Sequence, residues 1–129
     1  MIPDKRPLSP HLGIYRLPCT AWISITHRFT GIVLSVGMLL LALVPVVAAY
    51  GPDAYETLHA LLSSLIGRVS LWLWILAFVF HLCHGVRHIV WDVGMGYEKL
   101  QLNRYAALEI TAALLITAAA WIFTHNLDS

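Results

Sequence analysis

Three long apolar stretches constrain the fold of this chain more than any other feature of its sequence. They cover about residues 21–49, 69–93 and 105–125, and each reaches the roughly 20 residues needed to cross the ~30 Å hydrocarbon core of a bilayer. Apolar residues make up 59% of the 129-residue chain, above the roughly 45–50% usual in soluble globular proteins. The sequence therefore predicts an all-α fold, an integral membrane bundle of three transmembrane helices forming a single domain over residues 1–129.

The segment before the first apolar stretch has a different character. Residues 1–20 contain Lys5, Arg6 and Arg16 and are rich in proline, which favours an extended arm at the membrane surface over a helix. Thr20 is the predicted N-cap of the first transmembrane helix. No apolar run with a small-residue cleavage site precedes that helix, so we expect it to be retained rather than removed with a signal peptide.

A short helix is predicted between the first two transmembrane helices. Residues 53–66 open with Asp53 and Glu56 at capping-box spacing and place apolar residues at helical intervals. This segment is too short to span the bilayer, so we expect it to lie in the interface. Gly67 and Arg68 are expected to separate it from the second transmembrane helix.

Basic residues predict the orientation in the membrane. The N-terminal arm carries three of them and the second loop carries Lys99 and Arg104, whereas the first loop has only Arg68. Loops rich in Lys and Arg stay on the cytoplasmic side, so the N-terminus and the second loop should face the cytoplasm or the mitochondrial matrix. The net charge is only +1, which gives no electrostatic support for a nucleic-acid partner.

Two of the apolar stretches carry ionisable residues, each of which costs about 2.5–3.5 kcal/mol at a helix centre on insertion scales. In the first stretch these residues and their small polar neighbours fall on one helical stripe: Ser24, His27, Arg28, Gly31 and Ser35. The second stretch has a similar stripe, with His84 beside it and Arg87 just off it: His81, Gly85, His88 and Asp92. Both helices therefore have one polar face.

Consecutive transmembrane helices run in opposite directions, so the start of the first polar stripe and the end of the second lie at the same depth. His81 lies roughly 16 Å along the helix from Asp92 at 1.5 Å per residue, and is therefore near the middle of the membrane. Gly31 and Gly85 leave room for a bulky group to approach the backbone. A polar stripe with such gaps suggests a bound planar molecule.

The residue types match two redox cofactors. A histidine in mid-membrane can ligate haem iron when an acceptor fixes the proton of its other ring nitrogen, and arginine or histidine near the cytoplasmic end can pair with the propionates. A quinone carbonyl needs hydrogen-bond donors in an apolar pocket, which Ser24 and Arg28 can supply. Asp92 or a histidine can relay the protons that quinone reduction consumes.

Simpler interpretations of the same residues remain open. A histidine in a span can merely bond a neighbouring helix, and Ser24 can bond its own helix backbone. Arg28 and Asp92 can form an interhelical ion pair, and Glu109 can snorkel to the interface. The remaining alternatives concern metal binding by a histidine trio and packing by the two cysteines: His81, His84 and His88 for zinc or copper, and Cys19 and Cys83 as small apolar residues.

At these positions the sequence resembles the cytochrome b subunits of succinate dehydrogenase, the larger of two small membrane anchors in respiratory complex II. The matching segments are residues 6–12 (RPLSPHL), 24–31 (SITHRFTG) and 81–88 (HLCHGVRH), followed by Trp91 and Asp92. With three spans in the right order, the resemblance covers nearly the whole chain.

The resemblance implies a role for individual residues. The family's haem b ligand, four residues before a glycine, falls on His81, and the second axial histidine would come from the other small anchor. The ubiquinone-binding serine and arginine fall on Ser24 and Arg28, and the histidine near the haem propionates falls on His27. Two further residues match polar positions near the haem and the quinone, namely His88 in the propionate region and Asp92 in the quinone and proton region. His84 is a departure from the family pattern and offers a second, less favoured ligand.

The resemblance also implies a function and partners. The chain would be a subunit of succinate:ubiquinone oxidoreductase in the bacterial inner or mitochondrial inner membrane, bound to a flavoprotein subunit, an iron–sulfur subunit and a second small anchor. It has no flavin fingerprint and no cysteine-rich cluster motif, so it is not expected to oxidise succinate alone. The alternatives are a fumarate reductase anchor that uses menaquinone, and a haem-free structural anchor or small transport subunit.

Overall fold

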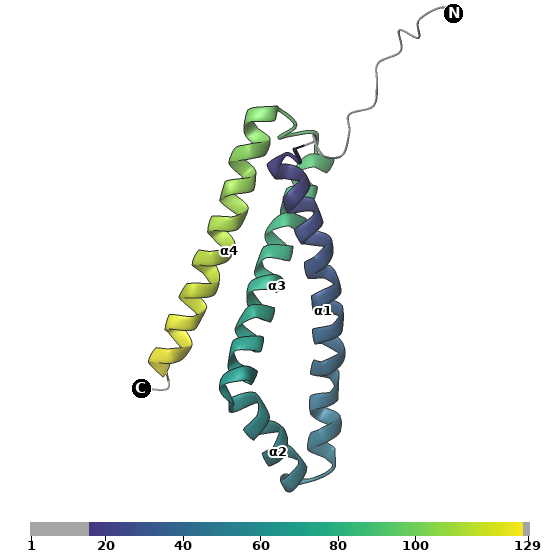
Figure 1. The fold of residues 1–129 in the computed structure, drawn as a ribbon, viewed down its shortest axis with the longest axis vertical. Coiled ribbons are helices and arrows are strands. Elements are labelled where there is room, and N and C mark those ends of the chain that lie inside the picture. The colour runs from purple at the N-terminus through teal and green to yellow at the C-terminus, as the bar shows by residue number, and fades with distance from the viewer. Residues whose placement is uncertain (1–15, 128–129) are drawn as a thin grey trace, which may run out of the picture.

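The fold is an all-α bundle, as the apolar stretches predict. The computed structural model describes residues 16–127, with the backbone alone at residues 99 and 100. This part of the chain forms four helices: α1 (Cys19–Ala49), α2 (Pro52–Ser63), α3 (Leu65–Asp92) and α4 (Lys99–Leu127). No strand occurs within it. Helix α3 lies between α1 and α4, and the short α2 joins α1 to α3 at one end of the bundle (Figure 1).

Three of the helices are long and apolar enough to cross a membrane: Cys19–Ala49, Leu65–Asp92 and Gln101–Leu127. These confirm the three predicted transmembrane helices. Their helical segments are longer than the apolar stretches because α3 begins before residue 69 and α4 begins before residue 105. The predicted arm over residues 1–20 lies largely outside the described residues.

Helix α1 begins two residues earlier than predicted. Its N-cap is Pro18, which has extended backbone angles and makes no side-chain cap, so Thr20 lies inside the first turn. The Pro18 carbonyl accepts hydrogen bonds from the backbone N–H groups of Ala21 at 3.0 Å and Trp22 at 3.4 Å. The prediction that Thr20 caps this helix was therefore wrong. The helix starts here without a capping hydroxyl, because the Pro18 carbonyl accepts the first backbone hydrogen bonds of the helix.

The short helix α2 begins and ends at other residues than the sequence suggests. Gly51, with φ 112°, is its N-cap, and Pro52 occupies the first turn, where proline's missing N–H costs nothing. Asp53 and Glu56 therefore do not form the predicted capping box. Asp53 instead lies in the first turn, where a carboxylate favours the positive end of the helix dipole.

The break between α2 and α3 is at Ser64 rather than at Gly67 and Arg68. The Ser64 hydroxyl caps α3 by accepting a hydrogen bond from the backbone N–H of Gly67 at 3.1 Å. Gly67 lies within α3, and a Cβ there would collide with the carbonyl oxygens of Leu61 and Leu62 at the end of α2. Glycine thus permits a tight corner between the helices, and the serine N-cap makes the break.

Two glycines make the turn between α3 and α4. Gly94 and Gly96 have φ values of 81° and 82°, a left-handed conformation that only glycine adopts without strain. They end α3 where the sequence predicts. The turn brings the start of α4 beside the end of α3 and the start of α1, so these three termini share one end of the bundle (Figure 1).

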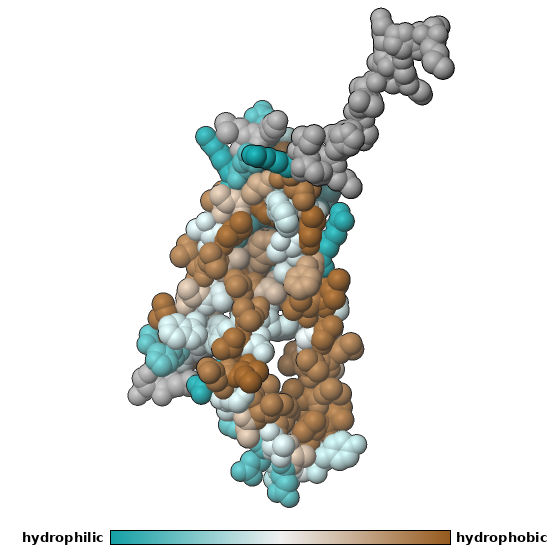
Figure 2. Space-filling model, in the orientation of Figure 1, coloured by the Kyte–Doolittle hydropathy of each residue, from teal (hydrophilic) through white to brown (hydrophobic). Residues whose placement is uncertain are grey.

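Few side chains are buried within the chain, because most of the apolar surface faces outward. The buried apolar core lies between the long helices and consists of Ile23, Val79, Phe80, Ala106 and Ala113. Figure 2 shows apolar side chains over the middle of the molecule and hydrophilic ones gathered mainly toward its ends. This pattern fits a bundle surrounded by lipid, whose ends lie at the two membrane surfaces.

Close packing of α1 on α3 depends on Gly37. A Cβ at this position would overlap the indole ring of Trp74, so Gly37→Ala should force the ring to move. Overpacking of this kind costs about 1–3 kcal/mol, and we expect a lower thermal unfolding temperature of the detergent-solubilised protein. The matched control is Val36→Leu, which enlarges an exposed neighbour. Equal unfolding temperatures for Gly37→Ala and the wild type would contradict the packing described here.

Candidate functional site

The two polar stripes meet in a cluster of four histidines. His27 comes from α1, and the other three come from α3. The ring of His27 lies at the centre, with centroid distances of 3.9 Å to His81, 4.3 Å to His84 and 5.8 Å to His88. The planes of His27 and His81 differ by only 15°, so these rings are stacked. The polar faces of α1 and α3 are therefore turned toward each other.

His81 is held by the backbone of α1. Its Nδ1 lies 3.2 Å from the carbonyl oxygen of His27 and 3.1 Å from the Thr30 hydroxyl. Thr30 is buried and donates to the same carbonyl at 2.8 Å. A carbonyl oxygen can only accept, so the contact with Nδ1 places the proton on that nitrogen. The lone pair of His81 is consequently on Nε2.

The two glycines of the stripes have different surroundings. A Cβ on Gly31 would lie 3.2 Å from Cε1 of His81, so this glycine lets the His81 ring approach the backbone of α1. A Cβ on Gly85 would meet nothing within 4 Å. The space at Gly31 is thus taken by a side chain of the same chain, whereas the space at Gly85 is open.

A buried charged group lies on the α4 side of the cluster. Glu109 of α4 accepts from Nδ1 of His84 at 2.9 Å and from Nη1 of Arg87 at 3.0 Å. Arg87 also donates from Nη2 to the carbonyl of Leu102 at 2.9 Å. The exposed fractions of His84, Arg87 and Glu109 are only 2%, 5% and 6%. The interpretation of Glu109 as a snorkelling residue was wrong, since its carboxylate is enclosed between helices.

The sequence contains features that could have predicted the contact of Glu109 with His84 and Arg87. A carboxylate inside an apolar stretch is expensive unless it is paired, and His84 and Arg87 are three residues apart on one face of α3. These two residues lie off the stripe that faces α1, so they were free to face α4. Only the rotation of α4 brings Glu109 to them.

The residues assigned to a quinone lie at the end of the bundle where α1 begins and α3 ends. Ser24 is half-buried, whereas Arg28 and Asp92 are exposed and form no ion pair with each other. Within the described residues Ser24 makes no hydrogen bond to its own helix, in contrast to Ser35, which donates to the Gly31 carbonyl at 2.9 Å. The Ser24 hydroxyl is therefore not used by the backbone of α1.

A metal-ligand geometry exists in the cluster, but with His27 in the place that the prediction gave to His81. His27, His84 and His88 each offer one ligand atom, and these atoms lie within 4.8 Å of one another. The zinc or copper alternative instead named His81, whose ring the structure holds against α1. His27 takes the place of His81 in this trio because it projects between the turns of α3 that carry the other histidines.

One buried nitrogen in the cluster has no partner within the described residues. Nε2 of His27 is enclosed and makes no hydrogen bond. Leaving such an atom unsatisfied costs about 1–3 kcal/mol. The arrangement therefore suits a polar group from outside this chain that reaches His27, and an anionic group would pair well with a histidine donor.

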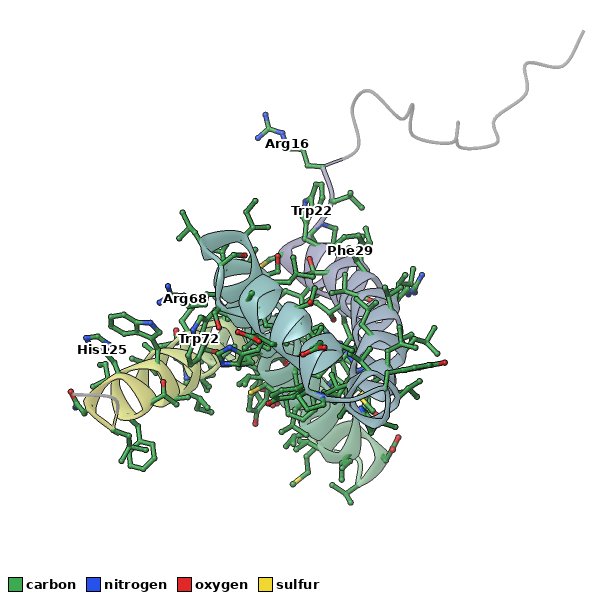
Figure 3. The ribbon with its side chains drawn as sticks, turned by 90° about the horizontal axis from the view of Figure 1, so that it is seen from below. Arg16, Trp22, Phe29, Arg68, Trp72 and His125 are labelled. Atoms are coloured by element: carbon green, nitrogen blue, oxygen red, sulfur yellow. The ribbon has the colours of Figure 1, made fainter. Side chains whose placement is uncertain are left out.

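Aromatic residues near the start of α1 point outward. Trp22 and Phe29 are 58% and 63% exposed, and both project away from the bundle in Figure 3. They leave the stripe with Ser24 and His27 on the other side of the helix. Lipid or another subunit must therefore cover this aromatic surface in a membrane.

Known proteins with a similar sequence share nearly the full length of the chain. A family model described as succinate dehydrogenase/fumarate reductase transmembrane subunit matches residues 3–124. The succinate dehydrogenase cytochrome b556 subunit of Rickettsia felis is 31% identical over 119 residues, which cover 92% of this chain and 93% of the relative. The corresponding b556 subunit of Paracoccus denitrificans is 34% identical, with 92% and 91% covered. A cytochrome b560 subunit from Reclinomonas americana is 36% identical, with 92% and 85% covered.

Proposed function

Because the chain belongs to the succinate dehydrogenase/fumarate reductase transmembrane subunit family, we propose that it binds haem b and forms part of the site where ubiquinone is reduced. It is a cytochrome b membrane subunit of succinate dehydrogenase, a component of an enzyme complex and not a catalyst alone. The cofactors carry the electrons, and the chain supplies binding, orientation and electrostatics.

The observation that carries the haem proposal is the environment of His81. An iron-ligating histidine presents a nitrogen lone pair while an acceptor holds the proton on its other nitrogen. Nδ1 of His81 contacts the His27 carbonyl at 3.2 Å, which leaves Nε2 for iron. The open space at Gly85, one turn along α3, favours a bulky planar group beside this face. His84 is less suitable, because its ring is 2% exposed and enclosed on the α4 side.

The other histidines of the cluster suit the haem propionates. His27 has a buried Nε2 without a partner within the described residues, and the exposed His88 ring lies 5.8 Å from the His27 ring. Both can donate to a carboxylate. Haem b would act as a one-electron carrier when bound. A second ligand would come from the other small anchor. This chain's contribution is one ligand and donors for the propionates.

The haem assignment can be tested by reduced-minus-oxidised absorption of the purified complex. We expect His81→Ala to abolish the b-type band, because the chain then offers no nitrogen at the ligand position. His84→Ala should retain the band, since His84 is bonded to Glu109 instead. A band that survives His81→Ala and disappears in His84→Ala would reverse the assignment. A wild-type complex without any b-type band would favour a haem-free structural anchor.

The quinone proposal rests on donors at the end of the bundle where α1 begins. Ser24 and Arg28 are one helical turn apart, and the Ser24 hydroxyl forms no bond to its own helix. A hydroxyl and a guanidinium of this kind can hold a quinone carbonyl. Asp92 is exposed at the same end and is not paired with Arg28, so it can exchange protons with water and pass them to the reduced quinone.

Substitutions of these donors should separate quinone reduction from succinate oxidation. Loss of one neutral hydrogen bond is worth about 0.5–1.5 kcal/mol, so Ser24→Ala should reduce the rate with ubiquinone about 2- to 10-fold. Arg28→Ala should reduce it further, and succinate oxidation by an artificial dye should stay near the wild-type rate in both. Ser35→Ala is the matched control, because its hydroxyl serves its own helix. Wild-type ubiquinone reduction by assembled Ser24→Ala and Arg28→Ala complexes would refute the site.

The surroundings follow from the family and the surface. Three apolar helices and relatives from bacteria and from organisms with mitochondria fit a multi-pass protein of the bacterial inner or mitochondrial inner membrane. We propose that its partners are the flavoprotein, the iron–sulfur subunit and a second small anchor, and that its N-terminus faces the cytoplasm or matrix. The exposed apolar side chains of α1, such as Phe29, require lipid or a neighbouring helix.

A fumarate reductase anchor is the second candidate, because the family description covers both enzymes. The relatives compared above are named as subunits of succinate dehydrogenase, which favours the first. The two enzymes differ in the redox potential of the quinone that they use. The test is therefore to compare the rate of the purified complex with ubiquinone and its rate with menaquinone.

A further inference from the structure

The buried group formed by Glu109, Arg87 and His84 has no place in the function proposed above. It joins α3 to α4 on the side of the histidine cluster away from the α1 backbone. A pair of this kind could serve only to hold two helices together. What distinguishes it is the third member, because His84 is also part of the histidine cluster.

The pairing of Glu109 with Arg87 determines which nitrogen of His84 carries the proton. Its carboxylate accepts a hydrogen bond from the Arg87 guanidinium at 3.0 Å, and a carboxylate paired with a guanidinium only accepts hydrogen bonds. The 2.9 Å contact with Nδ1 of His84 consequently places a proton on that nitrogen. A carboxylate that fixes the tautomer and orientation of an imidazole in this way is the usual partner of a histidine at a metal or cofactor site.

A continuous series of contacts leads from Glu109 to the proposed haem ligand. The ring of His84 lies 4.3 Å from that of His27, and His27 stacks on His81 at 3.9 Å. The backbone carbonyl of His27 also holds Nδ1 of His81. A change in the orientation of His84 therefore acts on the His27 ring, which stacks on His81.

We propose that Glu109, balanced by Arg87, is a positioning residue that fixes the row of contacting rings of His84, His27 and His81 and sets the local charge at the haem. The inference rests on the proposed function, because it concerns the haem that His81 would bind. It gives α4 a role in the site, although that helix carries no ligand.

Three variants of the complete complex test the charge part of the proposal. Glu109→Gln leaves the positive charge of Arg87 unpaired, which favours ferrous over ferric haem, so the midpoint potential should rise. Arg87→Gln leaves the carboxylate unpaired and should lower the potential. The double variant has neither charge and should return the potential close to the wild-type value. Potential shifts of opposite sign in the two single variants indicate an effect of charge. Loss of helix packing would shift the potential in the same direction in both.

Electron paramagnetic resonance of the oxidised haem tests the positioning part. The g-values of a low-spin haem depend on the orientation of its axial histidines, so they should change in Glu109→Gln. Thr111→Val is the matched control on α4, because Thr111 is exposed and, within the described residues, bonds only the Ala107 carbonyl. It should preserve both the potential and the g-values. If Glu109→Gln fails to assemble, Arg87→Gln still tests the sign of the shift.

Two outcomes would overturn the proposal while leaving the haem assignment intact. One is a wild-type potential and wild-type g-values in an assembled Glu109→Gln complex. The other is a shift of the same sign in Glu109→Gln and Arg87→Gln, which would indicate a packing role alone. A wild-type complex without haem would instead overturn the proposed function, and the two failures are therefore distinguishable.

Discussion

The structure depends on the cost of placing ionisable groups in a hydrocarbon environment. Such a group is costly there unless it is paired, because lipid offers no hydrogen bonds. His81 finds the backbone carbonyl of His27, and Glu109 finds Arg87 and His84. These contacts join α1 to α3 and α3 to α4. The same requirement therefore determines how the helices face one another and assembles the histidine cluster.

The two sides of that cluster have different chemistry. On the α1 side, a neutral carbonyl holds His81 and leaves the ring half-buried beside open space at Gly85. On the α4 side, His84 is buried and bonds the carboxylate of an ion pair. The first environment suits a residue that binds something from outside the chain. The second suits a residue that positions its neighbours. These are the roles proposed for His81 and His84, respectively.

Much of this was predictable from local patterns, and two features were missed for different reasons. The four-residue and three-residue spacings placed His27 and His81 on facing stripes, because helical periodicity alone decides which residues share a face. The break at Ser64 was missed because Gly67 was the stronger sequence signal, yet its role is close packing against Leu61. Glu109 was missed because its partners lie on another helix.

The sequence by itself determined the three transmembrane helices, their polar faces and the family, because apolar length, periodicity and motif spacing are properties of the chain alone. Only the tertiary structure decided which histidines come together and that Glu109 joins them. Those contacts depend on the rotation and relative depth of α1, α3 and α4. Rotation and depth are set by side-chain packing between helices, which no single segment encodes.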